Sequence, residues 1–158
     1  MIKKVLIKLL MKQMEVFPKF DLTNPRSESI NHPIFLNSDN EGKEEILSTM
    51  AENHYLVHQR KPFSINFPSH DFKRILENKD VLDLGCWCGG MSVLCAEEWS
   101  VRSMSGIDVD DYFIDAARKF SRSRKNKSIK YDFRTGFGES LPFQDDSFDA
   151  IISWDTFE

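Results

Sequence analysis

The chain has few cysteines, no long apolar run and no excess of positive charge. Three cysteines in 158 residues do not make a disulfide framework, so a reducing compartment, and with it a cytoplasmic location, is the simpler expectation. No apolar run approaches the ~20 residues that span a bilayer. Lys and Arg number 21 against 25 Asp and Glu, a net charge of −4. Since binding to nucleic acid needs a basic surface, we expect no nucleic-acid partner.

The composition is that of an ordinary globular chain, with 41% hydrophobic and 29% charged residues. The length allows one domain, or one domain with an appendage. Residues 1–17 have the apolar spacing and lysine-rich face of a basic amphipathic helix. It either packs on a domain or lies on a membrane surface, and we favour the first. Residues 18–43 are rich in proline and polar residues and predict a connector, and residues 43–58 predict a helix.

Residues 79–90 predict the opening of a βαβ unit. Lys79–Gly85 is a short apolar strand, a glycine-containing turn follows, and residues 91–99 have the pattern of a helix. A second strand, 104–107, ends at Asp108, which lies 23 residues after Gly85. This is close to the spacing of an acid that binds ribose hydroxyls.

The alternation of strands and helices continues to the end of the sequence. We expect a helix over 110–120 with Asp110 or Asp111 as its N-cap, and strands over 129–133 and 148–154. This pattern predicts an α/β protein with a doubly wound parallel sheet, whose ligand lies at the carboxyl ends of the strands. Because the sequence stops four residues after the fourth strand, we interpret it as a piece of a longer protein.

Three segments together carry a family resemblance: VLDLGCWCGG, GIDVDDYFIDAARKF and GESLPFQDDSFDAIISWDTFE. Their order and spacing resemble the class I S-adenosylmethionine-dependent methyltransferases of the small-molecule type. The resemblance implies a Rossmann-like sheet, of which residues 71–158 are the N-terminal half with the first four strands. It also implies S-adenosylmethionine as cofactor, S-adenosylhomocysteine as product and a small-molecule acceptor. Residues 1–70 are then an N-terminal helical extension and connector that can cover the active site.

The resemblance also implies roles for single residues. Asp83 would orient the first loop and help to hold the methionine ammonium group, while Asp108 would accept hydrogen bonds from both ribose hydroxyls. Other positions would lie beside the methionine, the adenine or the substrate. The candidate cofactor-binding residues are Asp83, Gly85, Cys86, Trp87, Gly89, Asp108, Val109, Phe137, Gly138, Glu139, Ser153 and Trp154.

The chain departs from the family pattern at two of these positions. Trp87 stands where the family has the middle glycine of G-x-G-x-G, so its ring must point away from the cofactor or cover it. Phe137 stands where an aspartate usually accepts a hydrogen bond from the adenine amino group. The loss of the middle glycine also argues against a nicotinamide oxidoreductase, which needs G-x-G-x-x-G. A fragment that binds cofactor without catalysing a reaction stays an alternative.

No metal site is expected. Cys86, Cys88 and Cys95 lack zinc spacing and read as small packed residues. His54 and His58 lie four residues apart, and we interpret them as exposed or capping histidines, with a role facing the substrate as the alternative. The catalytic residue is unknown, since Asp155 and the two histidines are only candidates for a base. Seven basic residues and no acid lie between Arg118 and Lys130, which predicts a solvated loop or a contact with an acidic or phosphorylated ligand.

Overall fold

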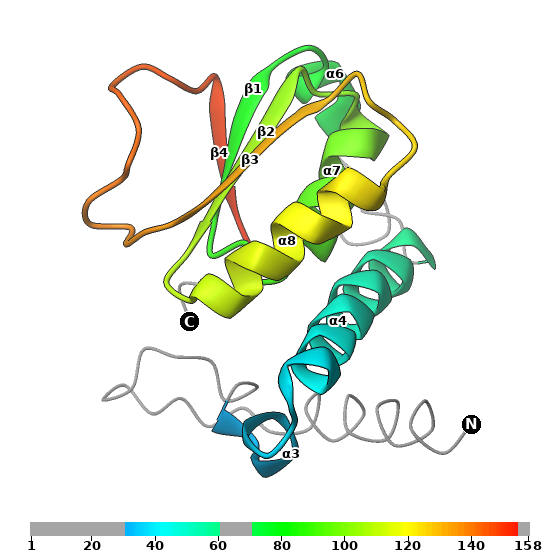
Figure 1. The fold of residues 1–158 in the computed structure, drawn as a ribbon. Helices are drawn as coiled ribbons and strands as arrows, with labels where there is room; N and C mark the ends of the chain where they lie inside the picture. Colours follow the sequence, from blue (N-terminus) through cyan, green and yellow to red (C-terminus); the bar gives the residue numbers. More distant parts are fainter. Residues whose placement is uncertain (1–30, 61–70, 155–158) are drawn as a thin grey trace.

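A four-stranded parallel sheet forms the centre of the molecule (Figure 1). The computed structural model describes residues 31–60 and 71–154. The strands are β1 (Asp80–Leu84), β2 (Ser103–Asp108), β3 (Lys130–Thr135) and β4 (Ala150–Ser153), in the order β3-β2-β1-β4. The four predicted strands are therefore confirmed, with ends that differ by one or two residues.

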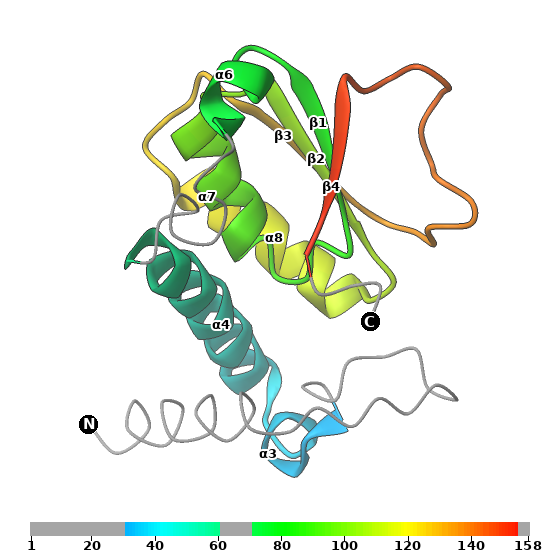
Figure 2. The same cartoon turned by 180° about the vertical axis from the view of Figure 1, so that it is seen from behind.

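The order of the strands confirms the predicted doubly wound topology. The chain moves outward from β1 through β2 to β3 and then returns to place β4 on the other side of β1. Helices α7 (Gly90–Trp99) and α8 (Asp111–Ser123) make the first two crossovers and lie on one face of the sheet (Figures 1 and 2). The connection from β3 to β4 loops out on the opposite side. The switch point of the sheet lies between β1 and β4, where such folds bind their ligands.

Local sequence explains where these elements begin. Val81 and Leu82 of β1 are fully buried, as expected for a central parallel strand. Asp110 caps α8 as predicted, because its carboxylate accepts a hydrogen bond from the Tyr112 backbone N–H at 2.9 Å. Ser100 ends α7 in the left-handed conformation.

Helix α4 (Asn40–Arg60) forms a second helical layer across α7 and α8. Its buried side chains belong to the same hydrophobic core as those of α7 and α8: Ile46, Leu47, Met50, Ala51 and Tyr55. The Tyr55 hydroxyl donates to Glu97 Oε2 at 2.8 Å, and Arg124 lies 4.1 Å from the centre of the Tyr55 ring. The helix predicted over 43–58 is present and longer at both ends.

The expectation that residues 18–43 form only a connector is wrong for its last part. A single turn, α3 (Pro33–Leu36), follows His32, whose side chain accepts a hydrogen bond from the Ile34 N–H. The turn is anchored by Phe35, which is 2% exposed. Helix α4 begins early because Asp39 accepts a hydrogen bond from the Gly42 N–H at 2.8 Å.

A short helix, α6 (Phe72–Leu76), precedes β1 and packs on α7. The predicted amphipathic helix 1–17 and the first half of the connector, 18–30, lie outside the described residues. Among the helices that the structure describes, none is long and apolar enough to cross a membrane. The domain boundary at residue 70 stays a prediction, although α4 shares the core of the sheet domain.

Candidate cofactor site

Backbone hydrogen bonds tie the loops together at the carboxyl ends of the strands. The N–H groups of Gly85 and Cys86 both donate to the Ile107 carbonyl at 2.9 Å, and the Gly136 N–H donates to the Asp108 carbonyl at 3.0 Å. The Ser153 hydroxyl donates to the Leu84 carbonyl at 3.0 Å. The ends of all four strands, and with them the predicted site residues that follow each strand, therefore lie along one edge of the sheet.

Asp108 links the first two of these loops. Its Oδ2 accepts a hydrogen bond from the Trp87 N–H at 3.0 Å, and its Oδ1 accepts one from the Asp110 N–H at 3.1 Å. Burial raises the pKa of this carboxyl, while its backbone hydrogen bonds lower it. Each carboxylate oxygen can accept a second hydrogen bond, so Asp108 retains the capacity to receive two hydroxyl groups.

Asp83 is the most deeply buried acid of the site, with 2% of its surface exposed. Its Oδ2 accepts a 2.6 Å hydrogen bond from the Ser92 hydroxyl, and its Oδ1 has no partner among the described residues. Burial raises the pKa of Asp83 to about 7, with a further rise from Asp108 and an opposing effect of Ser92. A carboxyl with one unmet oxygen gains from a cationic hydrogen-bond donor beside it.

Ser92 is a site residue that the sequence reasoning missed. It is fully buried in the first turn of α7 and is the only polar side chain in the run MSVLCA. Since an unpaired hydroxyl is costly in an apolar helix, a lone serine nine residues after a buried aspartate was the available signal.

The ring of Trp87 points into the helical layer. Its centre lies 5.2 Å from that of His54 on α4 and 5.7 Å from that of Phe113 on α8, both edge-to-face. The backbone of Trp87 has a φ of 48°, the left-handed conformation that suits the glycine found here in the family. The sequence left two arrangements open, a ring that points away from the cofactor and a ring that covers it. In the structure the ring contacts α4 and α8.

The two candidate histidines are close together, with ring centres 4.9 Å apart. Both are half-buried. The expectation of exposed or capping histidines is wrong for His54, because its ring packs on Trp87 in the middle of α4. The reason is tertiary, because α4 crosses the first loop at this point. Asp155 lies outside the described residues, and the catalytic base stays unassigned.

The glycines at the start of α7 serve the contacts between helices. A Cβ on Gly89, which has a φ of 74°, would lie 2.7 Å from the Cβ of Ala117 on α8. A Cβ on Gly90 would lie 2.3 Å from the carbonyl oxygen of Ala51 on α4. The structure thus turns Gly89, a predicted cofactor-binding residue, toward α8.

The loop after β3 differs from the first loop in its exposure. Phe137 is 57% exposed, and a Cβ on Gly138 would meet nothing within 4 Å. Glu139 is exposed as well, while Val109, Ser153 and Trp154, at the carboxyl ends of β2 and β4, are half-buried. Within the described residues, hydrogen bonds join this loop to the site only through Gly136.

The three cysteines are buried thiols, and burial raises their pKa values well above the usual range. They are packed residues of the turn and of α7, as predicted. In the part of the chain that the structure describes, no three His, Cys, Asp or Glu side chains gather as metal ligands do.

A doubly wound sheet with an acid at the end of β2 is the arrangement of an α/β domain that binds a nucleoside-containing cofactor. Comparison with known proteins narrows this class to the S-adenosylmethionine-dependent methyltransferases. Residues 81–158, just under half of the chain, match the family model described as "Methyltransferase domain".

Similar proteins differ in what their names say of the acceptor. The chain is 30% identical over 78 residues to a fatty-acid O-methyltransferase of Mycolicibacterium smegmatis, over 49% of this chain and 27% of that protein. It is 32% identical over 63 residues to the 7SK snRNA methylphosphate capping enzyme of Mus musculus, over 40% of this chain and 10% of that protein. The crystal structure of the YcgJ protein from Bacillus subtilis superposes with a TM-score of 0.44 at 30% identity, covering 52% of this chain and 34% of that one. The matched segments therefore span less than a third of either curated relative.

Proposed function

We propose that this chain binds S-adenosylmethionine at the carboxyl ends of its strands and transfers the methyl group to a small-molecule acceptor. The observation that carries the proposal is the joining of the first loop to Asp108 by the Trp87 N–H at 3.0 Å. This hydrogen bond holds the carboxylate against the loop that follows β1, where a nucleoside with a charged tail would contact both. The family whose model residues 81–158 match supports this choice of ligand.

The described acids fit such a cofactor. Asp108 can still accept from two hydroxyl groups, as the ribose offers. The unmet Oδ1 of Asp83 would lie near the methionine ammonium group, directly or through a water molecule. Phe137, in place of the family's aspartate, offers the adenine ring an apolar face in the open loop after β3. When bound, the cofactor supplies a methyl group on a positively charged sulfur, which leaves as a neutral thioether.

The residues of this chain then act mainly by position. A nucleophile gains the methyl group in line with the breaking C–S bond, so alignment contributes more than acid–base chemistry. Ser153 ends β4 and Trp154 follows it beside the switch point, where we propose that they face the reacting end of the cofactor. Buried groups such as Asp83 and Ser92 hold the first loop in one conformation before the ligand arrives.

We propose a small molecule as the acceptor, with no nucleic acid. The net charge of −4 supports this, as does the similarity to a protein named as a fatty-acid O-methyltransferase. The similarity to a protein named as an snRNA capping enzyme is the reason to include RNA in the test. Methyl transfer from labelled cofactor to fatty acids and to a short RNA separates the two acceptors.

Calorimetric titration of the chain with S-adenosylhomocysteine tests the cofactor, with NAD as the control ligand. We expect S-adenosylhomocysteine to bind and NAD not to bind. The Asp108→Ala variant should lose about 1–3 kcal/mol of binding free energy, because the ribose hydroxyls lose their acceptor. An unchanged affinity would remove Asp108 from this role. A folded chain that binds neither ligand would favour the alternative of a fragment without activity.

A further inference from the structure

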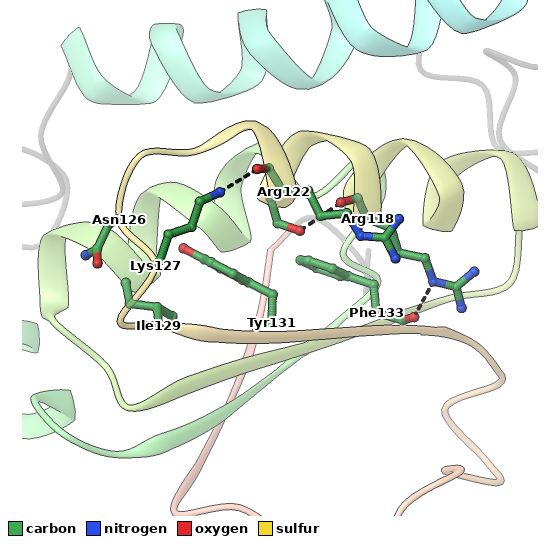
Figure 3. A pocket seen from close by; sticks show the side chains of 8 residues that line it. Arg118, Arg122, Asn126, Lys127, Ile129, Tyr131 and Phe133 are labelled. Carbon is green, nitrogen blue, oxygen red and sulfur yellow. Dashed lines mark hydrogen bonds between the residues drawn. The ribbon is translucent and has the colours of Figure 1, made fainter.

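A hollow lies between α8 and the edge strand β3, toward the amino-terminal end of that strand (Figure 3). Its cavity volume is about 250 Å³. It is lined by Arg118, Ser121, Arg122, Asn126, Lys127, Ile129, Tyr131 and Phe133, and we call it the α8–β3 pocket. Ile129 directly precedes β3 and Tyr131 lies at its amino-terminal end, whereas the candidate cofactor site lies at the carboxyl ends of the strands. The pocket is therefore separate from the candidate cofactor site.

The lining carries three cations and no acid. Arg118 donates through Nε to the Phe133 carbonyl at 2.9 Å and pairs with Asp115 on the outer side of α8 at 3.0 Å. Lys127 donates to the Arg122 carbonyl at 2.6 Å. The Arg122 side chain is exposed to solvent and has no ion pair or hydrogen bond among the described residues, so its donors are available to a ligand. This part of the sequence is the basic stretch 118–130.

Besides the cationic lining, the pocket contains a buried hydroxyl group, that of Tyr131. Its ring points from β3 toward α8 (Figure 3), and its buried hydroxyl has no hydrogen-bond partner among the described residues. Burial raises the pKa of Tyr131, so the phenol stays protonated and needs an acceptor. Glu97 is the acid that acts electrostatically on Tyr131, and its carboxylate is already paired with Arg124 at 3.3 Å.

Helix-end electrostatics explain only part of this arrangement. Cations are favoured at the C-terminal end of a helix, and the contact of Lys127 with the Arg122 carbonyl is such an interaction. It does not account for the buried phenol of Tyr131, which has no acceptor among the described residues. The Asn126 Oδ1 accepts from the Ser128 N–H at 3.0 Å, which leaves the amide NH₂ of Asn126 as a further donor.

We propose that the α8–β3 pocket binds the phosphate group of a small phosphomonoester. A phosphate offers several acceptor oxygens in different directions, which matches a lining whose unused groups are donors. The volume of the pocket is below the ~300–1,000 Å³ typical of sites for drug-sized ligands, which suits a small molecule. Arg122 and Tyr131 are the residues that would gain most from the ligand. The proposal does not depend on the proposed methyltransferase activity.

Titration calorimetry of the full chain at low ionic strength, with inorganic phosphate and with glycerol 3-phosphate, tests this proposal. We expect glycerol 3-phosphate to bind at least as tightly as inorganic phosphate. Arg122→Gln and Tyr131→Phe should each weaken binding by about tenfold, since each removes a donor to a charged group. Lys125→Gln, a change of charge in the same basic stretch but outside the lining, should change it by less than about twofold.

Three results would overturn the proposal. The first is a folded chain that binds neither phosphate. The second is an equal loss of affinity in Lys125→Gln and Arg122→Gln, which would indicate a diffuse charge effect. The third is binding of a single-stranded RNA oligonucleotide without binding of either small phosphate, which would indicate a polyanion surface. The Arg122, Tyr131 and Lys125 variants should all bind S-adenosylhomocysteine with the same affinity as the unchanged chain. A chain that binds phosphate but not S-adenosylhomocysteine would therefore contradict the proposed cofactor site and leave the phosphate proposal standing.

Discussion

The two loops expected to hold the two halves of the cofactor differ in what determines their conformation. The loop after β1 is buried under α4 and α8, and its glycines and Trp87 contact both helices. The loop after β3 is exposed, with Phe137 57% exposed and open space around Gly138. Tertiary packing therefore fixes the first loop, while the second has few contacts that a substitution would disturb.

This difference has a consequence for the cofactor site. Asp108 accepts a hydrogen bond from the backbone of Trp87, whose ring packs on α4. Helix α4 therefore acts through the first loop on the Asp108 carboxylate, the proposed acceptor for the ribose hydroxyls. The loop after β3, where we propose that adenine binds, can change without changing the core.

The largest contrast should come from adding one methyl group where the first loop enters α7 and one in the loop after β3. Gly90→Ala should lower the free energy of unfolding by about 3 kcal/mol, because the new Cβ would lie 2.3 Å from the Ala51 carbonyl oxygen. The control Gly138→Ala places its methyl group in open space and should change stability by less than about 0.5 kcal/mol. Urea unfolding measures both. Equal stabilities for the two variants would mean that α4 does not press on the start of α7.

Asp83→Asn removes the buried acid of β1, just before the first loop. The pKa of Asp83 is about 7 in the folded chain, against an ordinary aspartate value of 3.8, which we take for the unfolded chain. As the pH rises, the carboxyl of the unfolded chain therefore ionises first. This group therefore lowers stability progressively between about pH 4 and pH 7 and most above pH 7. At pH 8 the asparagine variant should be about 2–3 kcal/mol more stable, part of the ~4 kcal/mol that the shift represents. Thermal unfolding at pH 5 and pH 8 checks the sign, since the gain should shrink at the lower pH.

The same residue gives a pH dependence of binding if it faces the ammonium group of the cofactor. The carboxylate form binds a cation and the protonated form does not, so affinity for S-adenosylhomocysteine should rise between pH 6 and pH 8. Calorimetry in buffers of different ionisation enthalpy should detect proton release near pH 7. The Asp83→Asn variant should bind more weakly with no such change. A similar pH profile in both proteins would assign the proton to another group.

Trp87→Gly restores the family residue and separates strain from packing. Glycine adopts the φ of 48° at no cost, which gains about 1 kcal/mol. The loss of the ring contacts with His54 and Phe113 costs more, so the variant should be about 1–2 kcal/mol less stable. Chemical unfolding measures the difference. A more stable variant would show that strain outweighs the aromatic contacts.

Phe137→Asp should have the smallest effect on stability, less than about 0.5 kcal/mol, because the side chain is exposed. It restores the acid that the family uses for the adenine amino group, so affinity for S-adenosylhomocysteine should rise by up to about tenfold. Leu141→Asp adds an acid at another exposed position of the same connection and is the matched control. An equal effect of both changes would remove position 137 from the adenine site.

The sequence predicted the sheet domain better than its surroundings. Residues 79–120 carry a strand, a glycine turn, a helix and a cap whose signals are local, and each element is present within one to three residues. The turn at Pro33 and the early start of α4 were not predicted, because the side chains of His32 and Asp39 cap helices inside a segment that reads as a polar connector. Buried Phe35 shows that tertiary contacts support this segment.

The sequence by itself determined the class of fold and the positions of the acids after β1 and β2. Both follow from the period of apolar residues and from short-range spacing, which a chain carries without reference to its neighbours. Only the tertiary structure decided that Trp87 faces α4, that Gly90 makes room for the Ala51 carbonyl, and that Arg122 and Tyr131 line one pocket. These contacts join segments far apart in the chain, and their geometry depends on how the helices cross the sheet, which no local pattern specifies.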